Sequence, residues 1–359
     1  MNDDSPSEFN LSCPTPLGDH ATVQLAHGGG GRLMQGLIEG LFLPAFAGKG
    51  GEDLREQTPP HDSAVLEIDA TRLAFTTDSF VVSPLFFPGG DIGHLAVYGT
   101  VNDLAMAGAK PIALSAGFVL EEGLPMETLG RVVESMRRAA EEVGVWIVTG
   151  DTKVVDRGKG DGIFINTAGI GLIPQGIDIS PARVAPGDAV ITSGDLGRHG
   201  IAIMSVREGL SFEGALQSDC ASLAGLVEAL VEVDPDIHCL RDLTRGGLAA
   251  ALNEIARHAQ VGVELHEASI PVAEPVAGAC ELLGLDPLYV ANEGRLVAFL
   301  PAEAAERILE VMRNHPAAPQ PAIIGTVTED HPATVQIRSP LGGGRIVDLL
   351  SGEQMPRIC

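Results

Sequence analysis

A proline-rich segment, residues 174–188, is the feature that most constrains how this chain can fold. It contains Pro174, Pro181 and Pro186, and proline neither continues a helix interior nor donates a hydrogen bond in a central strand. Alternating strand-like and helix-like patterns lie on both sides of it. Because 359 residues are enough for two domains that each bury a core, the sequence predicts two domains of mixed α/β, or α+β, class.

The predicted elements follow from the spacing of apolar residues. Apolar and β-branched runs predict strands over residues 65–68, 73–77, 112–119, 146–148 and 163–173. Helical spacing predicts helices over residues 92–107, from Pro125 onward, over 247–258 and over 302–315. The predicted boundaries are a disordered extension (1–20), an N-terminal domain (21–175), a C-terminal α/β domain (186–335) and a flexible tail (336–359).

The net charge narrows the possible binding partners, and the cysteine spacing narrows the possible disulfide and metal sites. The chain carries 48 acidic and 23 basic residues, which argues against nucleic acid and anionic membranes. The acidic excess is either a solvated surface or a surface for a basic protein partner. The chain shows neither a signal-peptide pattern nor an apolar run of membrane-spanning length, so we expect a cytoplasmic protein. The spacing of the cysteines fits neither a disulfide framework nor a zinc site: Cys13, Cys220, Cys239, Cys280 and Cys359.

Aspartates stand beside predicted strand ends and glycine turns at five places: Asp62, Asp78, Asp103, Asp151 and Asp242. Any one of them fits ordinary turn or helix-cap chemistry. Together they favour a site for Mg²⁺ and a polyphosphate, because Mg²⁺ takes a few carboxylate oxygens and lets phosphate and water complete its octahedron. The absence of GxxxxGK[S/T] excludes a P-loop. The glycine run 28–31 is either an anion-binding loop or a plain flexible one.

Two further residues can carry proton chemistry. Lys153 comes directly after Gly150-Asp151-Thr152 and a predicted strand, where it holds a phosphate, relays a proton, or is only a solvated loop lysine. Glu293 lies between two apolar runs. It is either a turn residue or a base whose pKa is raised by partial burial.

The sequence as given ends on Cys359. A prenylation motif would place the cysteine four residues from the end, so that modification is excluded. Chain ends are poorly ordered in most domains, which makes a structural disulfide unfavourable. Two interpretations remain, a chance surface cysteine and a reactive thiol on a swinging arm.

Several of these motifs together resemble the hydrogenase maturation factor HypE. They are Thr76-Thr77-Asp78-Ser79, residues 84–93, Gly99-Thr100-Val101-Asn102-Asp103-Leu104, residues 150–155, residues 242–247, Asn292-Glu293-Gly294 and Pro356-Arg357-Ile358-Cys359. The aspartate motifs alone are shared with a wider ATP-binding superfamily that includes aminoimidazole ribonucleotide synthetase, selenophosphate synthetase and thiamine phosphate kinase. The terminal cysteine together with Gly-Asp-Thr-Lys is specific to HypE. The chain departs from the pattern at Gly29, where serine is expected, and residues 1–20 have no counterpart.

The resemblance implies both a fold and a reaction. It implies the two-domain fold of aminoimidazole ribonucleotide synthetase, with N-terminal domains paired in a homodimer and ATP near the domain junction. A HypF-type carbamoyltransferase would place a carbamoyl group on the Cys359 sulfur. The chain would then dehydrate this group to a thiocyanate with ATP and Mg²⁺. The cyano group would pass to iron on a HypC–HypD complex, for the [NiFe] hydrogenase centre.

The candidate site residues fall into three groups. The catalytic candidates are Cys359, Glu293 and Lys153. The metal-binding candidates are Asp62, Asp78, Asp103 and Asp242. The candidates for nucleotide binding are Asp62, Asp78, Asp103, Asp151, Asn102, Thr152, Thr244, Gly29 and Gly30.

Two alternatives stay open at this point. One is another synthetase of the same superfamily, such as selenophosphate synthetase. That resemblance would call for a reactive cysteine beside a lysine in the N-terminal loop, whereas Cys13 is followed by Pro14. The other is a non-catalytic ATP-binding scaffold whose acidic surface recruits maturation partners.

Overall fold

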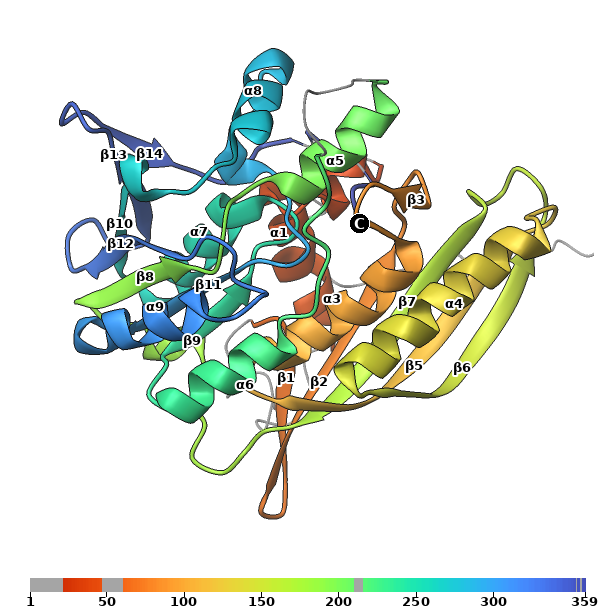
Figure 1. Cartoon of the computed structure of the whole chain (residues 1–359), viewed down its shortest axis with the longest axis horizontal. Helices are drawn as coiled ribbons and strands as arrows, with labels where there is room; N and C mark the ends of the chain where they lie inside the picture. The colour runs from red at the N-terminus through yellow and green to blue at the C-terminus, as the bar shows by residue number, and fades with distance from the viewer. Residues whose placement is uncertain (1–21, 47–60, 210–215, 353, 356) are drawn as a thin grey trace, which may run out of the picture.

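Two β-sheets dominate the fold (Figure 1). The computed structural model describes residues 22–46, 61–209, 216–352, 354–355 and 357–359. A five-stranded sheet has the order β1-β2-β7-β5-β6, a seven-stranded sheet has the order β14-β13-β10-β12-β8-β11-β9, and β3 (Phe86–Phe87) pairs with β4 (Gly90–Asp91). The predicted mixed α/β class is confirmed. The predicted disordered extension and Cys13 lie outside the described residues.

The five-stranded sheet comes from the first half of the chain. Its strands are β1 (Ala64–Ile68), β2 (Thr71–Phe80), β7 (Ile163–Leu172), β5 (Lys110–Glu121) and β6 (Trp146–Val155). Within this sheet β5 and β6 are parallel, and the other neighbouring strands are antiparallel. Two helices, α3 (Ile92–Met106) and α4 (Met126–Val143), cover one face, and α3 is buried nearly all round because it also packs against the second half of the chain.

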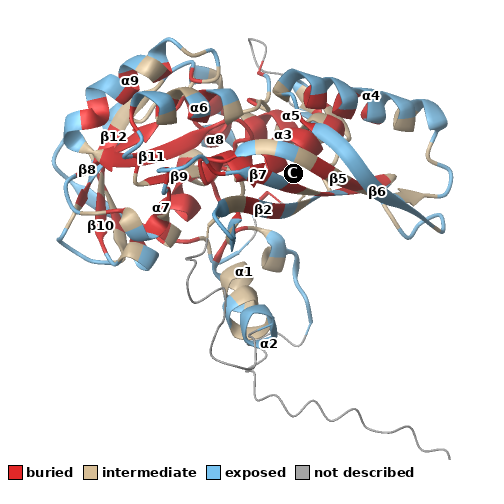
Figure 2. Ribbon diagram, turned by 90° about the horizontal axis from the view of Figure 1, so that it is seen from below, coloured by how far each residue is buried: buried red, intermediate tan, exposed pale blue. Residues whose placement is uncertain are grey.

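The other face of this sheet carries exposed apolar side chains and is uncovered by the described chain. Figure 2 shows β6 in the colour of exposed residues along nearly its whole length. Five large side chains on alternate strand positions stand out from this surface, which we call the open face: Phe75, Val119, Trp146, Ile170 and Leu172. A contiguous apolar face of this kind is typical of a protein–protein interface.

The seven-stranded sheet and its helices form the second half. Its strands are β8 (Asp188–Thr192), β9 (Cys239–Asp242), β10 (Gly262–His266), β11 (Leu296–Pro301), β12 (Ala322–Thr328), β13 (Thr334–Arg338) and β14 (Gly344–Val347). Its helices are α5 (Arg198–Arg207), α6 (Ala224–Val233), α7 (Gly247–Ala259), α8 (Glu274–Leu283) and α9 (Ala305–Arg313). Two short helices, α1 (Arg32–Leu37) and α2 (Leu43–Phe46), precede the first sheet. No helix in the described ranges is long and apolar enough to cross a membrane.

Most predicted elements are confirmed, and three predictions need correction. Gly150–Lys153, predicted as a turn after a strand, lies inside β6, because pairing with β5 continues to Val155. Residues 336–347, predicted as part of a flexible tail, lie mostly in β13 and β14, where Ile337 and Val347 are buried. The helix predicted over 302–315 begins as a 3₁₀ turn, and its α-helical part is α9.

Candidate functional site

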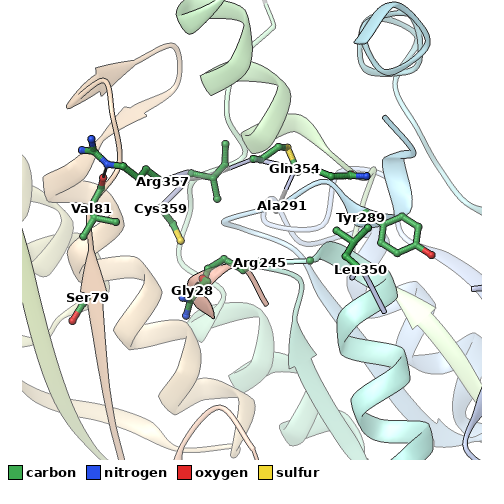
Figure 3. Close-up of a pocket in the computed structure, with 14 residues that line it drawn as sticks. Gly28, Ser79, Val81, Arg245, Tyr289, Ala291, Leu350, Gln354, Arg357 and Cys359 are labelled. Carbon is green, nitrogen blue, oxygen red and sulfur yellow. Dashed lines mark hydrogen bonds between the residues drawn. The ribbon is translucent and has the colours of Figure 1, made fainter. Parts of the chain in front are cut away.

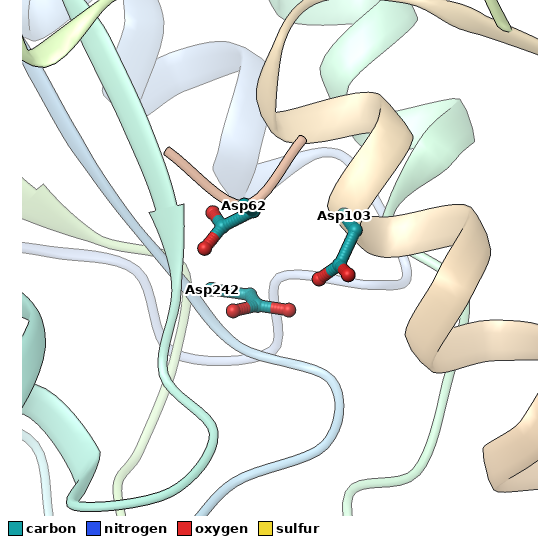
Figure 4. Close-up of side chains that lie close together, drawn as sticks. All are labelled: Asp62, Asp103 and Asp242. Carbon is teal, nitrogen blue, oxygen red and sulfur yellow. The ribbon is translucent and has the colours of Figure 1, made fainter. Parts of the chain in front are cut away.

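Three carboxylates from distant parts of the chain converge between the two halves. Asp62 lies just before β1, Asp103 is on α3, and Asp242 ends β9 (Figure 4). One oxygen from each lies within 4.8 Å of the others. A set of oxygen donors at this separation is what a hard divalent cation such as Mg²⁺ takes.

The electrostatics of this cluster also fit a cation. Burial is the largest cause that raises the pKa of all three carboxyl groups, and the pKa of Asp242 reaches about 6. Repulsion between neighbouring acids adds to the shift at each of them. Arg241 offsets part of this through a 2.7 Å ion pair with Asp62 Oδ1. The remaining oxygens Asp62 Oδ2 and Asp242 Oδ2 have no hydrogen-bond partner among the described residues. Buried acceptors without donors indicate that a ligand belongs here.

Two more buried acids, Asp78 and Glu293, interact with this cluster. Asp78 projects from β2 toward α3, and its pKa is raised by burial and partly restored by Arg245. Glu293 is 4% exposed in the loop before β11, and burial raises its pKa well above the usual value. The expected effect of burial on the Glu293 pKa is therefore confirmed. Its Oε1 has no hydrogen-bond partner within the described part of the chain.

A cavity of about 60 Å³ places the Cys359 thiol beside a cation. Gly28, Gly29, Ser79 and Arg245 are among its lining residues, and Figure 3 shows the Cys359 sulfur directed toward the Gly28 and Arg245 side. The Arg245 side chain donates a 3.0 Å hydrogen bond to the Gly28 carbonyl. Its pKa is raised chiefly by the charge of Cys359, and also by Asp78 and Glu293. Arg245 thus interacts electrostatically both with Cys359 and with the buried acids.

Two glycines of the run 28–31 pack too closely against other parts of the chain to carry a side chain. Gly30 has a φ of +75°, and a Cβ there would come within 2.6 Å of the Arg245 carbonyl oxygen. A Cβ on Gly31 would come equally close to the Leu350 carbonyl oxygen. Gly30 and Gly31 can therefore hold these positions only as glycine, whereas a Cβ on Gly28 would meet nothing within 4 Å.

The structure does not bring Lys153 to these residues within one chain. Lys153 and Asp151 form an exposed 2.6 Å ion pair on β6, which also lowers the pKa of Asp151. They share a surface hollow with Ser79, whose side chain points to the opposite face from its neighbour Asp78. Three strand spacings, about 14 Å, separate β6 from β2. Lys153 therefore lies on the open face, with Thr152 on the same strand.

Comparisons with known proteins decide the family. Residues 60–173 match the family described as AIR synthase related protein, N-terminal domain, and residues 185–338 match AIR synthase related protein, C-terminal domain. The carbamoyl dehydratase HypE of Azotobacter vinelandii is 56% identical over 340 residues, which cover 95% of this chain and 98% of that protein. The chain belongs to the HypE family.

Solved HypE structures have the same fold. A crystal structure of a HypE–HypF complex superposes with a TM-score of 0.81 at 46% identity, covering 88% of this chain and 99% of that chain. A HypE structure in complex with ATP gives a TM-score of 0.78 at 49% identity, covering 94% and 100%. As a member of this family, the chain is a hydrogenase maturation protein.

Two residues predicted to bind nucleotide, Asn102 and Thr244, make hydrogen bonds within the chain. Asn102 is buried; its amide donates to the Ala221 carbonyl at 3.0 Å and its oxygen accepts from the Leu223 amide at 2.7 Å. These bonds tie α3 to the segment before α6. The Thr244 hydroxyl hydrogen-bonds Asp242 and lowers the pKa of that carboxyl. Contact of either residue with nucleotide stays a prediction.

Sequence reasoning missed Arg245 and His199. Arg245 stands inside the quoted segment 242–247, so the motif itself is the signal that could have found it. The glycines around His199 favour loop packing, but the residue lies on α5 and contacts the segment that carries Cys359.

Proposed function

We propose that this protein dehydrates an S-carbamoyl group on its own Cys359 to a thiocyanate, coupled to hydrolysis of ATP to ADP and phosphate. The observation that carries the proposal is the position of the thiol. Cys359 is 8% exposed and lines a cavity with Arg245, whose charge also interacts with the buried Asp78 and Glu293. A chance surface cysteine has no reason to occupy such a cavity.

The steps of the proposed reaction give Glu293 and Arg245 separate chemical roles. The carbamoyl oxygen attacks the γ-phosphorus of ATP and ADP leaves. Loss of the phosphorylated oxygen and of both N–H protons then gives S–C≡N, so the products are the thiocyanate, ADP and phosphate. Glu293 is the base that takes a proton from nitrogen, because burial makes it a stronger base than a solvated carboxylate. Arg245 stabilises the negative charge that develops on the transferring phosphoryl group.

The acidic cluster holds Mg²⁺ in this proposal. Asp62, Asp103 and Asp242 supply the oxygens, and Asp78 adds a fourth carboxylate by direct contact or through water. When bound, the ion neutralises the phosphate charge. The HypE structure solved with ATP supports the nucleotide; Gly29 lines the cavity that contains Cys359, and Gly30 packs against the Arg245 backbone.

The open face is the homodimer interface in this proposal. It is apolar, it belongs to the N-terminal unit, and the described chain leaves it uncovered. Lys153, Asp151 and Thr152 lie on the strand that borders it. Because one chain does not bring Lys153 to its own Glu293, Lys153 acts on the site of the partner subunit.

The partners follow from the reaction. A HypF-type carbamoyltransferase supplies the carbamoyl group, and the HypE–HypF complex supports this assignment. A HypC–HypD complex holds the iron that receives the cyano group. The net charge of −25 favours basic surfaces on these partners.

A substitution at the thiol tests the proposal. Cys359→Ala incubated with the carbamoyltransferase should gain no carbamoyl mass, whereas Cys239→Ala, which changes a buried thiol elsewhere, should gain it normally. A carbamoyl group on the Cys359→Ala chain would refute the assignment. ATP turnover by the carbamoylated wild type, and its absence without carbamoylation, separates an enzyme from a scaffold.

A further inference from the structure

Helix α5 holds the segment that carries Cys359 through an imidazole. His199 is fully buried, and its Nε2 lies 2.7 Å from the Ile358 carbonyl oxygen. Its Nδ1 lies 2.8 Å from Ser218 Oγ. The Phe87 ring packs edge-on against the imidazole, with centroids 5.4 Å apart.

The surrounding hydrogen bonds fix which nitrogen carries the proton. Ser218 Oγ accepts a 3.0 Å bond from the Cys220 amide, so its own hydrogen is available for His199 Nδ1. Nε2–H then donates to the Ile358 carbonyl. Burial lowers the pKa of His199, which keeps the ring neutral and in this tautomer.

Other contacts set the direction of the same segment. The Val81 amide donates to the Cys359 main-chain oxygen at 2.9 Å, and the Ser83 amide donates to the Arg357 carbonyl at 3.4 Å. The segment thus runs antiparallel to Val81–Ser83. Arg207, at the far end of α5 from His199, donates to the Arg357 carbonyl and, at 2.6 Å, to the Ser83 carbonyl.

Apolar packing also holds the segment that carries Cys359 in place. Met355, Ile358 and Cys359 join the apolar cluster that contains Ile201 of α5 and Val290. Gly200 of α5 makes room for it, since a Cβ there would lie 3.1 Å from the Met355 sulfur. Backbone hydrogen bonds and burial hold the segment as a whole, while the imidazole of His199 holds the carbonyl of Ile358, the neighbour of the thiol.

We propose that His199, oriented by Ser218, is a positioning residue that docks the Cys359 segment in the cavity for the dehydration step. Its ring nitrogens bond Ser218 and Ile358 rather than the thiol or the acidic cluster, so it acts through the Ile358 carbonyl. This role in dehydration rests on the proposed function, but the docking itself does not. Undocking of the segment exposes the thiol, so docking can be measured without any turnover.

Alkylation of Cys359 in the full-length protein measures docking directly. Iodoacetamide reacts with the thiol in proportion to the undocked fraction, and peptide mass reports Cys359 separately from the other cysteines. His199→Ala should speed alkylation of Cys359 about five-fold, the factor expected from the loss of one net hydrogen bond. His258→Ala, which changes an exposed histidine at the end of α7, should leave the rate unchanged.

Two further variants keep the test decisive if His199→Ala folds poorly. His199→Gln keeps an N–H donor near the position of Nε2 and should restore slow alkylation. Ser218→Ala removes the group that sets the tautomer and should give an intermediate rate. Alkylation of folded His199→Ala at the wild-type rate would overturn the proposal, and so would alkylation of His199→Gln and Ser218→Ala at equal rates.

A second readout separates positioning from general destabilisation. Carbamoylated His199→Ala should bind ATP with wild-type affinity yet lose water more slowly, and His199→Gln should recover the rate. If no variant and no wild type dehydrates, the proposed function fails while the alkylation result still stands. If dehydration is intact and alkylation is unaffected in His199→Ala, the docking role fails alone.

Discussion

Removal of one carboxylate from the acidic cluster should stabilise the protein while abolishing its response to metal. Asp103 shows this most clearly, because its surroundings hold three acids, Asp62, Asp78 and Asp242, while its Oδ2 accepts a 2.8 Å hydrogen bond from a neutral group, the Thr76 hydroxyl. We therefore expect Asp103→Asn to be more stable than the wild type without metal, and less able to bind Mg²⁺-ATP.

The magnitude follows from the distance between the carboxylates. Two ionised groups 4.8 Å apart repel by about 3.5 kcal/mol at an effective dielectric constant of about 20. Protonation of Asp103 relieves part of this repulsion, because burial and the neighbouring acids raise the pKa of its carboxyl group. We expect a net gain in the free energy of unfolding of about 1–3 kcal/mol near neutral pH, which corresponds to a few degrees in the unfolding midpoint.

The same cluster sets the sign of a pH dependence. The pKa of Asp242 rises from 3.8, the ordinary value of a solvated aspartate, to about 6 in the folded chain. The folded state therefore binds more protons than the unfolded state between these values, and this contribution to stability falls as pH rises through about 4–6. Asp103→Asn should flatten that slope, and Mg²⁺ should reverse it in the wild type by favouring the ionised carboxylates.

Thermal unfolding with and without Mg²⁺-ATP tests these statements, with Asp156→Asn, on an exposed turn, as the matched control. The wild type should gain stability on adding Mg²⁺-ATP, by an amount that grows with ligand concentration, and Asp103→Asn should not. A variant that is less stable than the wild type without metal, and that responds to Mg²⁺-ATP as strongly as the wild type, would refute the reasoning.

The remaining predictions concern catalysis. Glu293→Gln should bind ATP and accept the carbamoyl group but form thiocyanate about 10²–10⁴-fold more slowly, as single-turnover mass measurements would show; a normal rate would remove Glu293 from the mechanism. Arg245→Ala should slow phosphoryl transfer by about 10²-fold or more, and Arg245→Lys should recover only part of it because a lysine cannot reproduce the guanidinium geometry; full activity of Arg245→Ala in an ADP-release assay would contradict its role. Lys153→Ala and Glu293→Gln should each be strongly slowed alone, yet mixed dimers should regain activity, since Lys153 serves the partner's site; the absence of any complementation in verified mixed dimers would contradict action across the interface.

The fold was predictable to the extent that local patterns decide it. The apolar spacing of residues 92–107 and the glycine at 108 match α3 closely, because a helix buried nearly all round leaves a dense apolar pattern. The end of β6 was not predictable in the same way. Gly150-Asp151-Thr152-Lys153 has the composition of a turn, and only its pairing with β5 keeps it extended.

The residues of the candidate site were likewise predictable only where the local sequence decides their role. The chemistry of Asp62, Asp103 and Asp242 is visible from residue type and from nearby glycines, and the structure brings the three together. The task of His199 depends on a hydrogen bond to a carbonyl 159 residues away, which no local pattern encodes. The separation of Lys153 from Glu293 depends on strand order and on which face each side chain takes.

The central claim is that Cys359 carries the group that is dehydrated. The most direct measurement is the mass of the Cys359 peptide, taken from carbamoylated wild-type protein before and after addition of Mg²⁺-ATP. We predict that the peptide carries one carbamoyl group beforehand and loses one water as one ADP is released. ADP release with the carbamoyl group on the Cys359 peptide unchanged, or water loss from a different peptide, would contradict the account.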